Sequence, residues 1–370
     1  MNIVLFYHSL LSDWNHGNAH FLRGISSELV RRGNQVTIYE PKESWSLKSL
    51  VADHGDAAVN EFYEYYPNLK SKRYDSTLDV HEALREADLV IVHEWNEHWL
   101  VKAIGEERKN AGFRLLFHDT HHRAVTDEES MQRYELKNYD GVLAYGEVIR
   151  QLYLQQGWTR RAWTWHEAAD TELFKPISAN YEGDLVWIGN WGDDERTKEL
   201  QEYLIEPVKT LGLKAKIFGV RYPEEATSSL ANAGIEYGGW LPNYKVPETF
   251  AKYRVTVHVP RRPYVESLPG IPTIRPFEAL ACGIPMVSSP WSDTENLFRA
   301  GKDFLMVQNG KDMTQAIMHL LSDEQSARDQ ALSGLETIRE RHTCAHRVDE
   351  LYSICEELGI KYYSTQRITT

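Results

Sequence analysis

A regular alternation of short apolar runs with amphipathic segments begins at the first residues and constrains the fold more than any other feature. The run from Ile3 to Tyr7 has the length of a strand, and a polar loop containing glycine follows it. Apolar residues then recur at helical spacing from Phe21 to Val30, and a basic turn ending at Gly33 precedes a second apolar run at 36–39. A strand, a helix and a strand in this order build parallel sheets, which predicts an α/β protein.

The alternation continues along the chain. The segments 88–92, 114–117 and 141–145 are predicted strands, with helices near 97–111 and 147–156, whereas 41–80 looks irregular and is interpreted as an insertion. A second series opens with a strand at 184–188. We expect it to continue with strands at 215–218, 255–259 and 284–288, and with helices near 196–211, 275–282, 312–321 and 324–341.

Two such series in 370 residues predict two doubly wound, Rossmann-like domains that face each other across a central cleft. The first predicted domain comprises residues 1–170, and the second comprises residues 171–345. A C-terminal helix and tail at 346–370 is expected to return towards the first domain. Ligands of such sheets bind beyond the carboxyl ends of the strands, so chemistry is expected there.

Charge excludes one large class of partner. The formal net charge is −13, and both halves are acidic: residues 1–180 carry 20 basic and 27 acidic residues, and 181–370 carry 21 and 27. Nucleic-acid binding depends on neutralising phosphates with Lys and Arg, so no nucleic-acid partner is expected, and binding to an anionic membrane is disfavoured. Three cysteines without a CxxC pair, no basic leader and no long apolar run predict a cytoplasmic protein without a transmembrane segment.

Two polar strand ends are candidate sites in the first half. Gly17 and Asn18 lie in the loop before the first helix, where backbone N–H groups could hold an anion; a tight turn that caps the helix explains them equally well. His118 opens the sequence HDTHHR at the end of a predicted strand, and His93 ends its neighbour. A histidine there could move a proton, or the loop could simply be solvated; the spacing matches no zinc motif.

The segment from Leu268 to Ser288 carries the strongest signal. A loop rich in proline and glycine leads into a short helix, a small-residue turn and a strand, an arrangement that suits a phosphate. Arg275 would add a cation, and Glu278 could accept hydrogen bonds from sugar hydroxyls. The alternative is a surface ion pair between residues three apart on a helix.

This segment resembles the donor-binding signature of GT-B glycosyltransferases. Residues 277–285, FEALACGIP, match the core FEAxAxGxP, and Arg275 matches the R-x-F-E form of the CgeB-like (spore-maturation) branch of the family-4-like enzymes. Three more segments match in order: 17–33 resembles the first loop and helix, 170–176 the motif that opens the donor domain, and 342–347 the HTxxxR of the C-terminal helix. The resemblance covers essentially the whole chain.

The resemblance implies a glycosyltransferase that uses a nucleotide-diphosphate sugar and no metal or other cofactor, and that retains anomeric configuration. Glu278 would hold the ribose, Trp240 and Leu241 would flank the base, and Arg196 and Arg275 would bind the diphosphate. The backbone amides of Gly270, Ile271, Pro272 and Thr273 would contact the diphosphate or the transferred sugar. His118 corresponds to a histidine near the reacting sugar carbon.

Some features of the pattern are missing or ambiguous. Gly270 replaces the first of two glutamates in the family-4 pattern, Asn190 replaces a diphosphate-binding arginine, and Asp193-Asp194 is interpreted as a helix cap and not as a metal motif. The acceptor could be a glycan, a small molecule, a lipid or a protein. Two other functions stay open: a nucleotide-sugar epimerase or hydrolase of the same fold, and a catalytically silent sugar-nucleotide-binding protein.

Overall fold

The computed structural model describes residues 1–360, and the chain divides into two compact units. Unit 1 contains residues 1–167 together with the C-terminal segment that begins at Cys344, and unit 2 contains residues 168–343. The tail residues 361–370, which belong to the predicted segment 346–370, lie outside the described residues.

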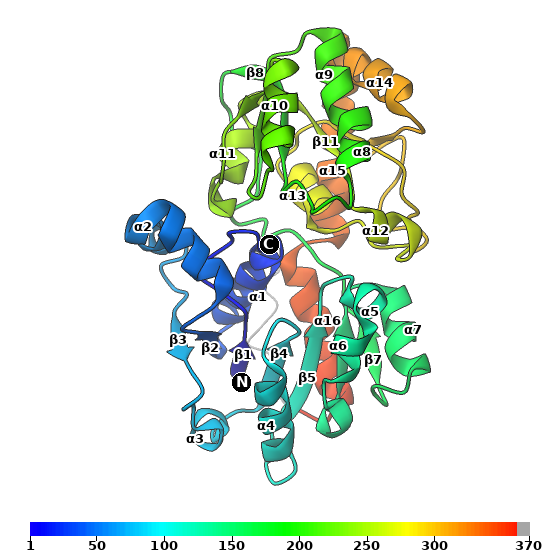
Figure 1. The fold of residues 1–370 in the computed structure, drawn as a ribbon. Coiled ribbons are helices and arrows are strands. Elements are labelled where there is room, and N and C mark those ends of the chain that lie inside the picture. The colour runs from blue at the N-terminus through cyan, green and yellow to red at the C-terminus, as the bar shows by residue number, and fades with distance from the viewer. Residues whose placement is uncertain (361–370) are drawn as a thin grey trace. The chain divides into compact units, whose positions relative to one another are not determined.

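Unit 1 is built on a seven-stranded parallel sheet in the order β3-β2-β1-β4-β5-β6-β7 (Figure 1). Its central strands are almost completely buried, as expected for a sheet covered on both faces. The strands are β1 (Asn2–Phe6), β2 (Gln35–Pro41), β3 (Ser71–Tyr74), β4 (Leu89–His93), β5 (Arg114–Asp119), β6 (Gly141–Ala144) and β7 (Ala162–Thr164).

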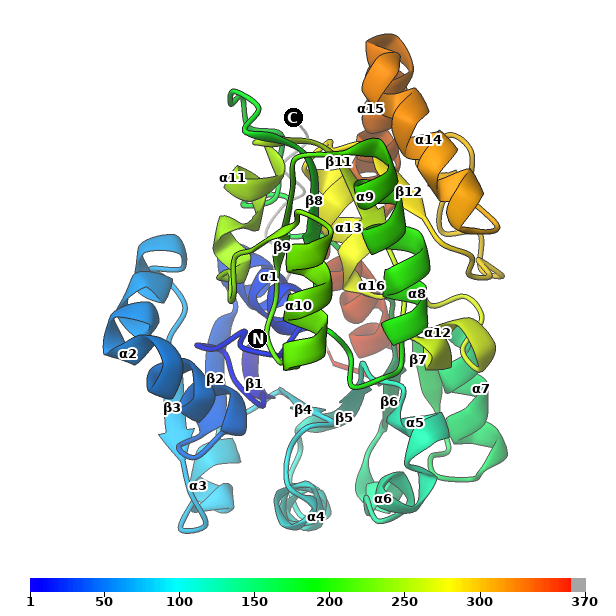
Figure 2. The ribbon, with the colours of Figure 1, turned by 45° about the horizontal axis from the view of Figure 1, so that its top comes forward.

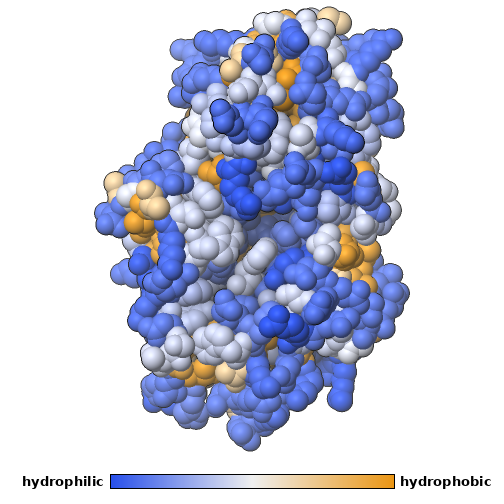
Figure 3. All heavy atoms as spheres, in the orientation of Figure 1, coloured by the Kyte–Doolittle hydropathy of each residue, from blue (hydrophilic) through white to orange (hydrophobic). Residues whose placement is uncertain are grey.

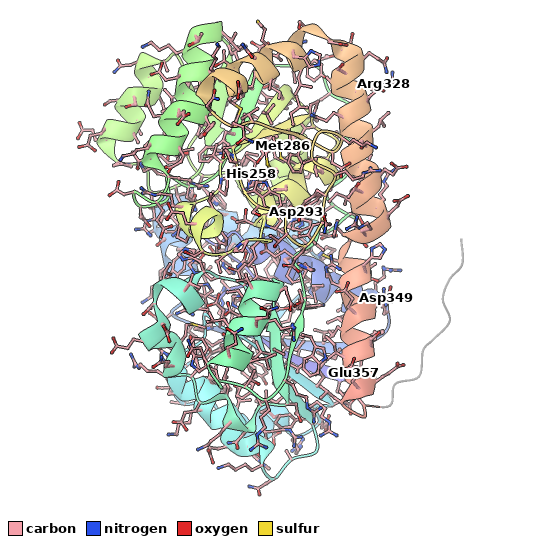
Figure 4. All side chains as sticks on the ribbon, turned by 90° about the vertical axis from the view of Figure 1, so that its right-hand side faces the viewer. His258, Met286, Asp293, Arg328, Asp349 and Glu357 are labelled. Atoms are coloured by element: carbon pink, nitrogen blue, oxygen red, sulfur yellow. The ribbon has the colours of Figure 1, made fainter. Side chains whose placement is uncertain are left out.

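Helices connect these strands, and one helix returns from the far end of the chain. They are α1 (Ala19–Arg31), α2 (Trp45–Tyr65), α3 (Val80–Leu84), α4 (His98–Arg108), α5 (Arg123–Thr126), α6 (Glu128–Gln132), the 3₁₀ turn η1 (Leu136–Asn138), α7 (Glu147–Gln155) and α16 (Cys344–Glu357). Helix α16 packs against α1. Figure 4 places Asp349 and Glu357 along α16; the first pairs with Arg32 at 2.6 Å, and the second accepts a hydrogen bond from Trp163 Nε1 at 2.9 Å.

The interpretation of 41–80 as an irregular insertion is wrong. Ser44 caps α2 by accepting a hydrogen bond from the backbone N–H of Leu47, and α2 buries Leu50 and Phe62. Strand β3 then extends the sheet at its edge. The helical pattern escaped detection because Gly55 has non-helical dihedral angles and kinks the helix, which interrupts the spacing of its apolar residues.

Unit 2 repeats the same plan. Its six parallel strands run in the order β10-β9-β8-β11-β12-β13, which matches the order in unit 1 apart from the seventh strand. The strands are β8 (Gly183–Ile188), β9 (Ala215–Phe218), β10 (Glu236–Tyr237), β11 (Tyr253–His258), β12 (Met286–Ser288) and β13 (Leu305–Met306). Both orders are those of Rossmann-type sheets, so the prediction of two Rossmann-like, doubly wound domains is confirmed.

The helices of unit 2 cover both faces of its sheet. They are α8 (Thr197–Leu200), the π-helical turn η2 (Gln201–Ile205), α9 (Glu206–Leu211), α10 (Glu224–Asn232), the 3₁₀ turn η3 (Asn243–Lys245), α11 (Val246–Phe250), α12 (Arg262–Glu266), α13 (Ile274–Ala281), α14 (Gly310–Ser322) and α15 (Glu324–Arg341). Figure 2 shows α8, α9 and α10 in front of strands β8 and β9, and apolar residues of these helices and of α14 form one buried cluster with the strands.

On the face drawn in Figure 3, hydrophilic residues predominate and apolar residues gather only in small, separate groups. This face therefore presents no broad apolar patch for a partner. Among residues 1–360, no helix combines the length and the apolar composition that crossing a membrane requires.

Candidate active site

In unit 2 the strand order reverses between β8 and β11, and polar loops follow both strands. Beyond β8 the chain runs from Gly189 to Arg196, and beyond β11 it runs from Val259 to Arg262. A crevice opens at such a switch point because the two connections leave in opposite directions, so it is the expected ligand site of the sheet.

Arg196 ties these two loops together. Its guanidinium donates to the carbonyl of Val259 at 2.9 Å, to that of Asn190 and to that of Trp191 at 3.4 Å, and it lies 5.0 Å from the centre of the Trp187 ring. The sequence assigned Arg196 to the diphosphate. In the structure its guanidinium donates these hydrogen bonds to backbone carbonyls. Arg196 therefore positions the two loops and adds its positive charge to the crevice.

Two further arginines add positive charge to the same place. Burial lowers the pKa of Arg196, and the charges of Arg261 and Arg275 lower it further. Arg261 contacts Glu195 at 3.2 Å and Arg275 pairs with Glu278, so three cations share two carboxylates. This excess of positive charge favours an anion, because a bound phosphate would neutralise it. Sequence reasoning missed Arg261, although it follows a predicted strand and the switch-point rule could have found it.

Glu278 connects the helix α13 to the loop after Trp240. Its carboxylate is fully buried, accepts a hydrogen bond from Asn243 Nδ2 at 2.7 Å and pairs with Arg275 one turn earlier. The two residues therefore do form the ion pair that the alternative interpretation named, but it is not a surface pair, because Glu278 is fully buried and the Arg275 side chain is only 18% exposed. Trp240 and Leu241, both half-buried, precede Asn243 by only a few residues, so the structure brings the predicted base-binding and ribose-binding residues into one region.

Two residues of the loop 270–273 have positive φ angles, which favour glycine. Gly270 has φ +93°, and a Cβ there would lie 2.7 Å from Glu295 Oε1 and 2.9 Å from Thr294 Oγ1. Thr273, the residue before α13, has φ +65°, a conformation that costs a β-branched residue energy. A residue with a Cβ at position 270 would therefore be strained, and the side chains of Glu295 and Thr294 would have to shift to make room for it.

Two neighbouring features differ in detail from the sequence interpretation. Asp193-Asp194 does not cap the next helix: α8 begins after Arg196 without a side-chain cap, both aspartates have positive φ, and Asp193 pairs with Arg221 at 3.0 Å. Asn190 accepts a hydrogen bond from the backbone N–H of Val220 at 2.9 Å, which links the loops after β8 and β9.

In unit 1 the corresponding switch point, between β1 and β4, is lined by histidines. His8 follows β1, and His93 of β4 lies opposite His118 of β5 in the strand register, so the predicted proximity of the strand ends 93–95 and 118–123 is confirmed. His16 comes from the loop before α1. Neighbouring ring centres in the series His8, His16, His93 and His118 are 5.5, 6.2 and 5.5 Å apart.

These imidazoles are uncharged at neutral pH. Burial lowers the pKa of His8 to about 4 and that of His118 to about 3, and burial together with neighbouring charges lowers the pKa of His16 and His93 well below the usual value. One buried ring nitrogen of each has no hydrogen-bond partner within the described part of the chain. A neutral imidazole with a free nitrogen can donate or accept a hydrogen bond according to its tautomer.

The loop residues Gly17 and Asn18 lie beside this histidine series. Asn18 is the residue before α1, but its side chain does not cap the helix; its Nδ2 donates to the carbonyl of Thr120 at 3.1 Å. Thr120 Oγ1 in turn lies 2.8 Å from His93 Nε2. Asn18 therefore links the loop before α1 to the residue that follows β5 through a hydrogen bond.

A buried ion pair supports the same strand ends. Arg123 contacts Glu94 Oε2 at 2.6 Å, and Tyr153 donates to Asp119 at 2.8 Å. Burial, reinforced by the charge of Asp119, raises the pKa of Glu94 to about 8, and burial raises the pKa of Asp119 to about 6. Within residues 1–360, no group of three or more His, Cys, Asp and Glu side chains is arranged to hold a metal ion.

One family model matches a stretch that covers most of unit 2 and the beginning of helix α16. Residues 196–353 match the family model described as "Glycosyl transferase-like". No curated protein sequence matches the chain. The matched range contains Arg196, Arg261, Arg275 and Glu278, the residues at the switch point of unit 2.

Several solved structures resemble this chain over nearly its whole length. Sucrose-phosphate synthase from Thermosynechococcus elongatus has a TM-score of 0.66 at 14% identity, covering 97% of this chain and 99% of its own. HepE from Anabaena, solved with UDP, has a TM-score of 0.65 at 13% identity, covering 96% and 100%. An α-glucosyltransferase solved with UDP and a 13-mer DNA has a TM-score of 0.69 at 12% identity, covering 96% and 99%.

These similarities confirm the predicted GT-B fold over nearly the whole chain. Residues 196–353 match a glycosyl transferase-like model, and this match bears out the prediction of a transferase enzyme. The assignment to a CgeB-like branch and the roles of individual residues stay predictions.

Proposed function

We propose that the protein transfers a sugar from a nucleotide-diphosphate sugar to an acceptor hydroxyl, without a metal ion and with retention of anomeric configuration. The observation that carries this proposal is the group of three guanidiniums at the switch point of unit 2, where the charges of Arg261 and Arg275 act on Arg196, next to the buried carboxylate of Glu278. Among glycosyltransferases, the R-x-F-E sequence favours the CgeB-like branch.

The donor would bind along these residues. Glu278 would accept hydrogen bonds from the ribose hydroxyls, with Trp240 and Leu241 beside the base. Arg261 and Arg275 would meet the diphosphate, while Arg196 holds the loops. The loop 270–273 would contribute backbone N–H groups, from Gly270, Ile271 and Thr273, near the transferred sugar.

The reaction breaks the bond between the anomeric carbon and the diphosphate oxygen and forms a bond from that carbon to the acceptor oxygen. The transition state carries positive charge on the sugar and negative charge on the departing diphosphate, so preorganised guanidiniums lower the barrier. The acceptor proton passes to the departing diphosphate. His118, which is neutral, would contact the transferred sugar without adding a charge that opposes the oxocarbenium-like state.

A thermal-shift panel with UDP, GDP, ADP, dTDP and CDP tests the donor site. A nucleotide at 100 times its dissociation constant stabilises the protein by about 2.7 kcal/mol, a shift of a few degrees. UDP is the first candidate, because HepE, a structural neighbour, was solved with it. Arg261→Ala should abolish the shift, whereas Arg328→Ala, a change on α15 far along the chain from these loops, should leave it intact (Figure 4). No shift with any nucleotide would contradict the proposal.

Two other functions make different predictions. An epimerase or hydrolase would convert the nucleotide sugar in the absence of any acceptor. A catalytically silent binding protein would show the thermal shift but no turnover with any acceptor. Turnover that depends on an added acceptor distinguishes the transferase from both.

A further inference from the structure

Three tryptophans lie close together near His8, beside the histidine series of unit 1. The ring centre of Trp45 lies 4.6 Å from that of His8, and the rings of Trp14 and Trp95 lie 6.5 and 6.4 Å from Trp45. Trp45 remains 39% exposed, although it lies against this buried ring. We call His8, His16, Trp14, Trp45 and Trp95 the Trp–His cluster. It combines apolar ring faces with unused hydrogen-bonding nitrogens.

The polar groups of this cluster are uncharged. His8 Nε2 and His16 Nε2 are buried without a partner among the described residues. Buried polar atoms normally have a hydrogen-bond partner, because an unsatisfied one costs about 1–3 kcal/mol. Two such nitrogen atoms next to exposed aromatic surface indicate a binding site in which hydroxyl groups of a ligand supply the hydrogen-bond partners.

The cations that act on these histidines already have partners. Arg23, which is fully buried, donates to Asp13 Oδ2 at 2.8 Å and to the carbonyls of Leu10 and Leu11. Arg123 pairs with Glu94 and lies 4.2 Å from the centre of the Trp95 ring. Their charges are therefore compensated within unit 1.

A carboxylate also lies at the edge of the cluster. Asp53 of α2 accepts a hydrogen bond from Trp14 Nε1 at 2.9 Å. A phosphate or carboxylate group bound here would approach this charge and would lose hydration without gaining a free cation.

We infer that the Trp–His cluster is the acceptor site and that the group it binds is an uncharged pyranose, neither a phosphorylated sugar nor a nucleic acid. The inference rests on the proposed glycosyl transfer, for which it names the acceptor class. One face of a pyranose ring carries C–H groups that pack on an indole, and its edge carries hydroxyls that both donate and accept. Neutral imidazoles match those hydroxyls in both directions.

A nucleobase would also stack on tryptophan, so the choice between acceptors depends on charge. The phosphates that accompany a base need Lys or Arg contacts for affinity. The compensated state of Arg23 and Arg123 therefore favours the sugar over the nucleic acid.

The experiment measures binding to the full chain saturated with UDP, by saturation-transfer NMR and titration calorimetry. The probes are methyl β-glucoside, maltose, glucose 6-phosphate and a single-stranded 13-mer oligonucleotide. Trp45→Ala removes the exposed ring and Trp45→Phe retains a smaller one. Trp99→Ala is the matched control, because Trp99 is equally exposed, at 41%, but lies on α4 outside the cluster.

We expect saturable binding of at least one neutral sugar and weaker binding of glucose 6-phosphate. Trp45→Ala should weaken the binding of the neutral sugar by at least about tenfold, and Trp45→Phe should weaken it by less. Trp99→Ala should leave the affinity for the sugar unchanged. Tighter binding of the phosphorylated sugar or the oligonucleotide, no sugar binding, or equal effects of the two alanine variants would each overturn the inference.

Titration with UDP alone, on the same samples, tests the donor function separately. If UDP binds and the neutral sugars do not, the acceptor inference fails while the proposed function stands. If UDP does not bind, the nucleotide that gives the thermal shift replaces it in these titrations. If none of the five nucleotides binds, the proposed function fails, and the inference fails with it.

Discussion

The two units use the same strand order but present opposite chemistry at their switch points. In unit 1, strands β1 and β4 end in buried imidazoles that are uncharged, with the nearby guanidiniums of Arg23 and Arg123 paired to carboxylates. In unit 2, strands β8 and β11 lead into loops where the charges of two guanidiniums lower the proton affinity of a third. The topology determines where a ligand can bind, and the side chains on the loops determine which charge it carries.

This difference suits a reaction between a charged and an uncharged substrate. Binding a diphosphate requires cations that are not fully neutralised by the protein, whereas binding a hydroxyl requires neutral donors and acceptors. The following predictions test whether the contrast is real.

The largest expected effect is that of His118→Ala on turnover. If this neutral imidazole contacts the reacting sugar, its loss should lower kcat by about 10²–10⁴-fold while UDP affinity stays near that of the parent protein. Steady-state kinetics and UDP titration, measured on the same sample, separate the two quantities.

His54→Ala provides the control, because His54 is an exposed histidine of α2 in the same unit. Full turnover by His118→Ala would assign the histidine series to structure alone. Equal losses of turnover and of UDP affinity would indicate a folding defect, which the thermal transition of unit 1 would reveal.

Arg275→Ala should affect both binding and stability. Losing a charge-assisted contact should weaken UDP binding by about 1.5–3 kcal/mol. The change also leaves the buried carboxylate of Glu278 without its cation, which should cost about 3 kcal/mol of unfolding free energy. Calorimetric titration and chemical denaturation measure the two effects.

The double variant Arg275→Ala/Glu278→Gln separates these effects. Removing the buried charge should restore much of the stability but none of the UDP affinity. Unchanged affinity in Arg275→Ala would remove this residue from the donor site and weaken the contrast between the units.

Acid should destabilise unit 1 more than unit 2. The lowered pKa of His8, about 4, and of His118, about 3, means that the unfolded chain binds protons below pH 6.5 that the folded chain does not. Stability should therefore fall as pH drops from about 6.5 to about 4.5, by up to about 1.4 kcal/mol per pH unit for each such histidine.

Two carboxyl groups oppose this trend. The raised pKa of Glu94 and of Asp119 makes the folded state bind protons that the unfolded state has lost, so their contribution grows as pH falls. Against them act the lowered pKa values of His8, His16, His93 and His118 in unit 1, whereas in unit 2 burial lowers the pKa of His258 to about 3. Calorimetric scans from about pH 7 to about pH 4.5 should show this difference, and His8→Gln, but not His54→Gln, should reduce it.

The smallest expected effect is that of Gly270→Ala. The positive φ of this residue should make alanine cost about 1–2 kcal/mol of unfolding free energy. Gly234→Ala is the matched control: Gly234 has φ +72°, but no atom lies within 4 Å of the place its added methyl group would take, so it reports backbone strain without a clash. An equal loss in both variants would show that Glu295 and Thr294 move aside easily.

The sequence supported much of the fold because parallel strands and their helices are encoded locally. The apolar runs at 3–7 and 88–92 and the helical spacing after Phe21 needed no distant contacts to be recognised. Helix α2 was missed because a single kink at Gly55 disrupts its period, and a local pattern contains no information about the sheet edge that β3 completes.

The residues of the site divide in the same way. Arg275 and Glu278 lie three positions apart on one helix, so a motif can reveal them. Arg196 meets the loop of Arg261 only because β8 and β11 are neighbours in the sheet, although 63 positions separate Arg196 from the carbonyl of Val259 that it binds. Trp45 and His8 likewise come from different elements, and nothing in the spacing predicts their contact.

The sequence by itself determined the α/β class, the two Rossmann-like domains, the acidic charge and the glycosyltransferase signature, because each depends on order and composition along the chain. The tertiary structure alone decided that the imidazoles are buried and neutral, that Arg275 pairs with a buried Glu278, and that Gly270 has a backbone conformation that favours glycine. Burial and hydrogen bonding set the charge of a side chain and the room around it, and both depend on segments that only folding brings together.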